Sequence, residues 1–254
     1  EIGSCDWSSD VCSSDLQEDV KMRGILYGVG VGPGDPELMT LKAVRLIKEN
    51  DIIAVPGAEV RETVAYKIAV QAVPELADKE LLPIYMPMTH DKAELELNHE
   101  KGAKALEAAL DTGKNVVFLT LGDPTVYSTY LYVHHRLVAQ GYDTEIVCGI
   151  TSFCAVSARL NTGLVEKAEP LHVIPASYQI EDALKLPGTK VLMKAGKKMK
   201  NVKEQLLAQG AEAMMIENCG MPDEKIYRSV EEIPEDAGYY SLIIIKENKE
   251  RTQE

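Results

Sequence analysis

Two hydrophobic patterns alternate along the first half of the chain. Short apolar runs predict buried strands, and stretches in which apolar residues recur every three to four positions predict amphipathic helices. The expected strands span residues 24–27, 52–55, 81–85, 115–120 and 144–147. The expected helices span residues 37–47, 62–73, 92–110 and 127–140. Strands that alternate with helices of this length are typical of a mostly parallel sheet.

The second half of the chain has a different pattern of apolar residues, with strand-like runs closer together and fewer helical stretches. Strand-like runs are expected at residues 171–174, 190–193, 213–216, 225–228 and 239–246, and helices at 179–186 and 199–209. Strands this closely spaced predict a mixed sheet with an antiparallel part. We therefore expect an α/β protein with an N-terminal α/β domain at 22–163, a C-terminal α/β domain at 164–247 and a charged tail at 248–254.

Residues 1–21 do not share these patterns. They are rich in Ser and Asp, without a basic start or an apolar core, so they do not form a signal peptide. They resemble a translated sequencing-adapter read fused to a start near Met22, and we expect a foreign or disordered leader. The leader holds acids and no Lys or Arg before residue 20, so the rest of the chain is less acidic than the net charge of −13 suggests.

The net charge and the positions of the cysteines argue against several classes of function. A net negative chain does not favour a nucleic-acid partner, and no apolar run reaches the length of a membrane span. Outside the leader, Cys148, Cys154 and Cys219 are scattered, without a C-x-x-C pair. This pattern predicts reduced thiols in the cytoplasm and no metal site.

A glycine-rich turn at residues 28–36 follows the first predicted strand, and it is the first of three loops that predict a ligand site. A dinucleotide-binding fingerprint is the first alternative for such a turn. It fails because Pro33 stands where the third glycine belongs, and because the next strand ends in Pro56 rather than in an acid. Two further loops, 121–128 and 148–153, also follow predicted strands. Since ligands of open α/β sheets bind beyond the carboxyl ends of strands, the three loops predict a ligand site.

The three loops resemble the sequence motifs of the tetrapyrrole methylases. Gly30–Ala43 matches the first motif, Gly122–Ser128 the second and Cys148–Ser152 the third, with Cys148 where proline is common. The resemblance implies two α/β domains with S-adenosylmethionine in the cleft between them. It also implies a set of cofactor-binding residues, namely Pro33, Leu121, Gly122, Asp123, Val126, Thr151, Ser152, Ala195 and Gly196. Cys219, Gly220 and Met221 are a weaker match to that set.

Within the family, the chain resembles most the enzymes that methylate carbon 20 of precorrin-2 or cobalt-factor II in cobalamin biosynthesis. The segments that carry this narrower resemblance are Tyr27–Leu38, Asp51–Pro56, Tyr85–Thr89 and Glu224–Tyr227. The resemblance therefore implies a methyltransferase with a small-molecule tetrapyrrole substrate, as a homodimer. Methylation of another ring carbon, or a non-catalytic tetrapyrrole- or nucleotide-binding module, stays open.

A polycarboxylate substrate needs local basic groups, although a solvated helix face is an equal alternative for the basic residues available. The candidates are Arg61, Lys194, Lys197, Lys198, Lys200 and Lys203. The candidate proton acceptors are Asp123, Tyr127 and His90, each of which also suits a structural role.

Overall fold

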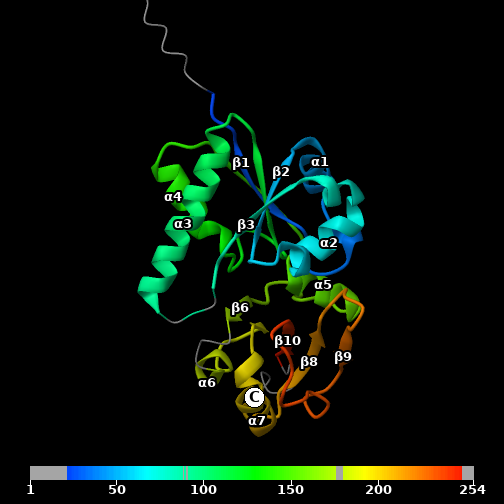
Figure 1. Ribbon diagram of the computed structural model, residues 1–254. Coiled ribbons are helices and arrows are strands. Elements are labelled where there is room, and N and C mark those ends of the chain that lie inside the picture. Colours follow the sequence, from blue (N-terminus) through cyan, green and yellow to red (C-terminus); the bar gives the residue numbers. More distant parts are fainter. Residues whose placement is uncertain (1–21, 88, 90, 176–179, 248–254) are drawn as a thin grey trace, which may run out of the picture.

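Two sheets of five strands form the protein, and they lie one above the other in Figure 1. The computed structural model describes residues 22–87, 89, 91–175 and 180–247. The predicted leader (1–21) and the predicted tail (248–254) lie outside these ranges. Within the described part, no helix combines the length and the apolar character that crossing a bilayer requires.

The first sheet is entirely parallel, with strand order β3-β2-β4-β1-β5. Its strands are β1 (Leu26–Gly30), β2 (Ile52–Pro56), β3 (Glu80–Ile84), β4 (Val116–Thr120) and β5 (Thr144–Val147). Four of the five apolar runs form strands within one residue of the predicted bounds, and the expected parallel sheet is confirmed. The first strand, expected at 24–27, is Leu26–Gly30 instead, so the first three residues of the predicted glycine turn belong to β1. The order places β1 between β4 and β5, which neither periodicity nor spacing predicts.

Helices cover both faces of the first sheet (Figure 1). They are α1 (Leu41–Glu49), α2 (Val64–Ala72), α3 (Lys92–Leu110) and α4 (Tyr130–Ala139), with short 3-10 turns at Pro36–Leu38, Val60–Glu62 and Pro74–Asp78. The helices α1 and α2 pack on one face and α3 and α4 on the other, and each pair buries a separate apolar cluster against the strands. Burial on both faces explains why these strands are almost continuously apolar.

The helix expected from residue 37 begins later. Pro36–Leu38 forms a 3-10 turn, and α1 begins after Thr40, whose Oγ1 accepts a hydrogen bond from the Ala43 N–H at 3.1 Å. A threonine cap of this kind fixes the start of a helix. Leu41, expected on the apolar face, is 89% exposed, and Ala43 and Ile47 are buried in its place.

The second sheet is mixed, as the sequence predicts. Its strands are β6 (Leu171–Pro175), β7 (Thr189–Met193), β8 (Glu212–Glu217), β9 (Lys225–Tyr227) and β10 (Ser241–Lys246), in the order β6-β7-β10-β8-β9. Only the pair β6 and β7 is parallel among these strands. The helices α6 (Ile180–Ala183) and α7 (Met199–Ala208) pack on one face of this sheet.

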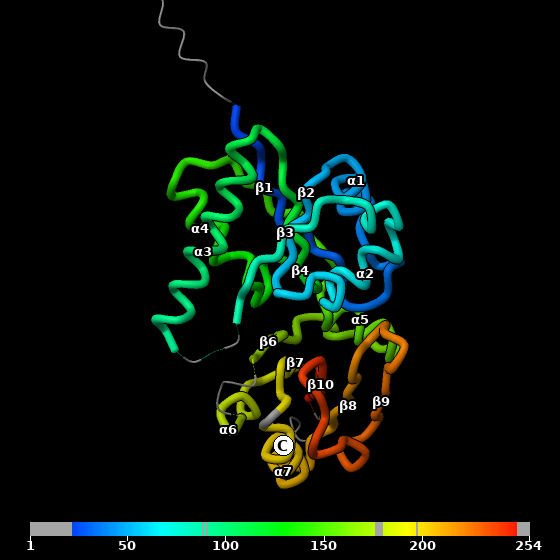
Figure 2. The backbone as a smooth tube through the Cα atoms, in the orientation of Figure 1, coloured from blue at the N-terminus to red at the C-terminus, as the bar shows by residue number. Residues whose placement is uncertain are grey.

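One helix links the two sheets. The helix α5 (Ser152–Arg159) follows β5 of the first sheet, yet it packs on the second sheet. Its residue Val156, with Leu160 just beyond its end, joins the apolar cluster formed by Val191, Ile216, Leu242 and Ile244. Figure 2 shows α5 at the level where the two sheets meet. The domain boundary near residue 163 stays a prediction.

Candidate functional site

The three predicted loops meet because the strands before them are neighbours. The loops after β4 and β5 flank the glycine loop after β1, since β1 lies between those strands. Gly32 and Gly122 exchange backbone hydrogen bonds, from the Gly122 N–H to the Gly32 carbonyl at 2.8 Å and in return at 3.3 Å. The parallel sheet thus gathers at one edge three segments that are far apart in sequence.

The backbones of the three loops cross one another at very short distances, and glycines at positions 30 and 149 make this crossing possible. A Cβ atom on Gly149 would lie 2.1 Å from the carbonyl oxygen of Gly122, and one on Gly30 would lie 2.5 Å from the same oxygen. Because the obstructing atom belongs to the backbone, it cannot swing aside. The crossing therefore requires glycine at both positions.

The Asp123 side chain fastens two of the loops together. It is only 7% exposed. Its Oδ1 accepts hydrogen bonds from the Thr125 N–H at 2.7 Å and from the Thr125 hydroxyl, and its Oδ2 accepts one from the Gly149 N–H at 2.8 Å. Both oxygens are therefore used to hold the loop backbone, which is the structural role that the sequence left open for this residue.

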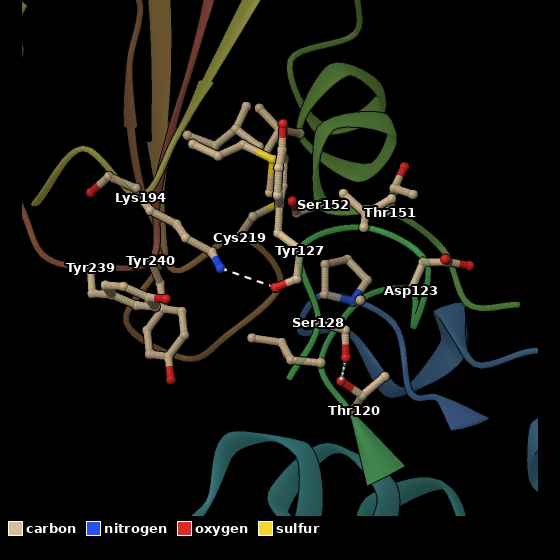
Figure 3. A pocket seen from close by; sticks show the side chains of 18 of the residues that line it. Thr120, Asp123, Tyr127, Ser128, Thr151, Ser152, Lys194, Cys219, Tyr239 and Tyr240 are labelled. Carbon is tan, nitrogen blue, oxygen red and sulfur yellow. Dashed lines mark hydrogen bonds between the residues drawn. The ribbon is translucent and has the colours of Figure 1, made fainter. Parts of the chain in front are cut away.

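A cavity of about 540 Å³ lies between these loops and the second sheet (Figure 3). Most of the cofactor residues that the resemblance implies line it, namely Pro33, Leu121, Gly122, Asp123, Val126, Thr151 and Ser152. Its volume falls within the range of small-molecule sites, about 300–1,000 Å³.

Ala195 and Gly196 are not among the lining residues. Ala195 is 1% exposed and packs in the core beside α7, while Gly196 begins a 3-10 turn. Their predecessors Met193 and Lys194 line the cavity instead. The cavity wall therefore lies two residues before the predicted pair, and a cofactor contact of Ala195 and Gly196 stays a prediction. Of the weaker matches, Cys219 and Met221 line the cavity and Gly220 does not.

The second sheet adds lining residues that sequence reasoning missed. They are Tyr239, Tyr240, Ser241 and Leu242. The sequence predicts a strand from residue 239, but β10 begins at Ser241, so the two tyrosines belong to the loop before it. The sequence did offer one signal for a binding surface, namely two adjacent aromatic residues directly before a buried strand. Successive residues of an extended chain point to opposite sides, so the two rings of such a pair cannot both enter the core.

Tyr127 connects the two sheets. The sequence places it in a helix, but α4 begins only at Tyr130, and Tyr127 has a left-handed backbone with φ of 51°. Its hydroxyl donates to the Val173 carbonyl on β6 at 3.0 Å, and its own carbonyl accepts from Lys194 Nζ at 3.2 Å. The hydroxyl is therefore engaged in a structural bond. His90, the third candidate proton acceptor, lies outside the described residues.

Burial raises the pKa of two groups that line the cavity. Burial, with a smaller contribution from the nearby Glu224 carboxylate, raises the pKa of the Cys219 thiol to about 11. Burial also raises the pKa of the Tyr240 hydroxyl, with the neighbouring Tyr239 as a second cause. Both groups are therefore protonated at neutral pH and supply no anionic base.

One polar atom beside the cavity has no protein partner. Thr151 precedes the first turn of α5, and its Oγ1 is buried without a hydrogen bond. Buried hydroxyl groups normally have a partner, and leaving one unsatisfied is unfavourable. The residue Thr151 lines the cavity, but this oxygen is enclosed by protein atoms. The resemblance assigns Thr151 and Ser152 to contacts with the cofactor.

The basic residues proposed to bind substrate carboxylates lie in different places in the structure. Of the candidates whose side chains the structure describes, Lys194 alone lines the cavity. Arg61 donates to the Tyr66 hydroxyl and the Ala77 carbonyl, while Lys203 donates to the carbonyls of Glu231 and Ile233. Lys200 lies 3.8 Å from Glu235, and Lys198 also has interactions elsewhere. Nothing is described for the Lys197 side chain. Across the described residues, no group of three His, Cys, Asp or Glu side chains is arranged to hold a metal ion.

Comparison with known proteins gives the same family as the three loops. The sequence profile of the tetrapyrrole (corrin/porphyrin) methylases matches residues 25–234. A probable cobalt-precorrin-2 C(20)-methyltransferase of Methanocaldococcus jannaschii is 37% identical over 232 residues, which is 88% of this chain and 96% of that protein. The cobalamin biosynthesis protein CobIJ of Mycobacterium tuberculosis is 31% identical over 240 residues, or 90% of this chain. The chain spans only 47% of the length of CobIJ.

A solved structure extends the comparison to the fold. Uroporphyrin-III C-methyl transferase from Thermus thermophilus, in complex with S-adenosyl homocysteine, superimposes with a TM-score of 0.66 at 23% identity. The match covers 88% of this chain and 98% of that one. At this level of identity the match establishes the two-sheet α/β fold.

Proposed function

The chain belongs to the tetrapyrrole methylase family, and from this we propose that it transfers a methyl group from S-adenosylmethionine to carbon 20 of precorrin-2 or cobalt-factor II in cobalamin biosynthesis. Relatives with C(20)-methyltransferase names support the position of methylation. The observation that carries the proposal is the cavity itself. It is lined by the family's three loops on one side and by the second sheet on the other.

The cavity suits S-adenosylmethionine. The backbone at Leu121–Asp123 and the side chain of Pro33 would hold the cofactor from one side, and Thr151 and Ser152 would contact its polar groups. The match to the family's third motif, and the place of both residues on the cavity wall, support this assignment. When bound, the cofactor supplies an electrophilic methyl group on a positively charged sulfur.

The chain contributes mainly positioning and exclusion of water. Val126, Met193 and Leu242 place apolar side chains on the wall of the cavity. A water-poor site favours a reaction in which charge disperses, and fixed orientation of the reactants lowers the barrier further. Asp123 supports the site by fixing the loops, since both of its oxygens accept hydrogen bonds from the chain.

The test uses protein trimmed to Met22, S-adenosylmethionine, and precorrin-2 or its cobalt form in separate reactions. We expect the product of one form to gain a single methyl group by mass, with a ¹³C-labelled methyl found at carbon 20 by NMR. A label at another carbon would keep the family and overturn the position. Cofactor binding without a product from either form would favour a non-catalytic module.

We also propose that the protein is a cytoplasmic homodimer. Tyr132 and Val138 on α4 and Leu97 on α3 are exposed, and apolar side chains of this size are common at subunit contacts. The unpaired Cys148, Cys154 and Cys219 suit a reducing compartment. Sedimentation velocity should give one species at twice the mass of the chain, and a single species at the monomer mass would overturn the dimer.

A further inference from the structure

Lys194 is the one Lys or Arg that lines the cavity among the described residues. It follows β7 and has a left-handed backbone with φ of 61°, which is uncommon for a residue other than glycine. Such backbone geometry is concentrated at functional sites, where the surrounding structure holds it. The side chain is directed from the second sheet toward the loop after β4 (Figure 3).

The Lys194 ammonium lacks an acidic partner. Its Nζ donates to the Tyr127 carbonyl at 3.2 Å, and no carboxylate of the described residues forms an ion pair with it. An ammonium group has three donors, so two remain for a ligand. Asp123, the acidic residue on the same cavity wall, has both oxygens occupied by Thr125 and Gly149.

Aromatic rings surround this cation. The Nζ atom lies 5.9 Å from the ring centre of Tyr127 and 6.0 Å from that of Tyr239. Tyr239 in turn packs edge-on against Tyr240, with 5.3 Å between the ring centres, and both rings are partly exposed. A cation beside exposed aromatic surface suits a flat, apolar ring system that carries carboxylates at its edge.

We propose that Lys194 binds a carboxylate of the tetrapyrrole substrate, with the rings of Tyr239 and Tyr240 beside the macrocycle. The proposal rests on the function proposed above. In this arrangement the Tyr127 carbonyl and ring hold the ammonium in place before substrate arrives. Lys194 is then a determinant of substrate affinity, whereas the loops around Thr151 and Asp123 determine cofactor affinity.

The experiment compares Lys194→Met and Lys194→Arg with the matched control Lys200→Met, whose lysine lies on α7 and faces Glu235. Tetrapyrrole affinity is measured by fluorescence titration with uroporphyrin III, a non-substrate macrocycle that carries acetate and propionate groups. Cofactor affinity is measured by calorimetry with S-adenosyl homocysteine. The KM and kcat values for the precorrin are measured alongside, all on protein trimmed to Met22.

For Lys194→Met we expect the uroporphyrin Kd and the precorrin KM to rise about tenfold to one-hundredfold, the loss typical of a charged hydrogen bond. The S-adenosyl homocysteine Kd and kcat should change less than about twofold. Lys194→Arg should recover most of the affinity because it keeps the charge, and Lys200→Met should match the wild type.

Two results would overturn the proposal. Unchanged tetrapyrrole affinity in Lys194→Met would show that the ammonium does not contact the substrate. A loss confined to S-adenosyl homocysteine would assign Lys194 to the cofactor's carboxylate. If the wild type methylates no precorrin, the proposed function fails, yet the uroporphyrin titration still decides whether Lys194 binds a tetrapyrrole carboxylate.

Discussion

Asp123 and Gly149 are joined by a 2.8 Å hydrogen bond from the Gly149 N–H to Asp123 Oδ2, although 26 positions separate them. The bond connects the loop after β4 to the loop after β5 across the end of β1. The carboxylate thus holds the backbone that lines one side of the cavity. Under the proposed function, Asp123 would support cofactor binding through the loop backbone, without contact between its side chain and the reacting atoms.

The first prediction concerns this carboxylate. Asp123→Ala should lower the free energy of unfolding by about 1–3 kcal/mol, because the buried N–H groups of Thr125 and Gly149 lose their acceptor. It should also weaken S-adenosyl homocysteine binding at least tenfold. Urea unfolding and calorimetry measure the two effects. Asp123→Asn keeps one acceptor oxygen and should fall between the wild type and Asp123→Ala. Unchanged affinity in Asp123→Ala would contradict the assignment of this loop to the cofactor.

The second prediction concerns the loop crossing. Gly149→Ala should destabilise the protein by about 1–3 kcal/mol and weaken cofactor binding, because its Cβ would lie 2.1 Å from the Gly122 carbonyl oxygen. Gly163→Ala is the matched control. The nearest atom to its Cβ lies at 3.8 Å, so its stability should stay within about 0.5 kcal/mol of the wild type. Equal melting behaviour of the two variants would contradict the crossing.

The third prediction tests whether the Tyr127 hydroxyl has a structural role or a catalytic one. Tyr127→Phe removes the hydroxyl that donates to the Val173 carbonyl but leaves the ring and the carbonyl in place. We expect stability to fall by about 0.5–1.5 kcal/mol, the usual net value of one hydrogen bond, and kcat to change less than about tenfold. A general base contributes about one-hundredfold or more, so a loss of that size in kcat would show that Tyr127 takes part in proton transfer.

The fourth prediction is a pH dependence. Because burial raises the pKa of Cys219 to about 11, only about one thiol in a thousand is ionised at pH 8. In protein trimmed to Met22, iodoacetamide should therefore alkylate the exposed Cys148 and Cys154 long before Cys219. The Cys219 rate should rise about tenfold per pH unit up to about pH 11. Peptide mass spectrometry gives the three rates, and fast labelling of Cys219 at pH 7 would contradict the prediction.

Sequence reasoning succeeded where local pattern determines structure. Residues 92–110 form α3 and 144–147 form β5 as predicted, because periodicity and flanking glycine or aspartate mark both ends. The three loops were also found from sequence, since glycine, proline and aspartate directly after a buried strand have a specific backbone use. Leu41 was misplaced because apolar spacing alone does not reveal which side of a helix faces the sheet. In α1 the buried side carries Ala43, Leu46 and Ile47, which pack against the strands.

The rest of the cavity depends on contacts between distant segments. No local pattern places Lys194 and Tyr239 opposite the loop after β4, since that requires the strand order of the second sheet and its packing on α5. Tyr127 leaves its predicted helix for the same reason, because its hydroxyl bonds to β6. The loops on one side of the cavity were therefore predictable. On the facing side the sequence pointed to Lys194, Cys219 and Met221, but not to Tyr239 and Tyr240 or to the contact between the two sides.

The packing of α5 on the second sheet restricts how the cavity opens. Thr151 and Ser152 begin this helix, while Val156 and Leu160 bury their side chains against β7, β8 and β10. If the second sheet swings outward as a rigid body, it carries α5 with it, and so moves Thr151 and Ser152 away from the loops after β1 and β4. Bending then falls on the segment between β5 and α5, next to the point where Gly149 is fastened to Asp123. Under the proposed function, opening the cavity for a bulky macrocycle would therefore also move Thr151 and Ser152, two of the proposed cofactor residues.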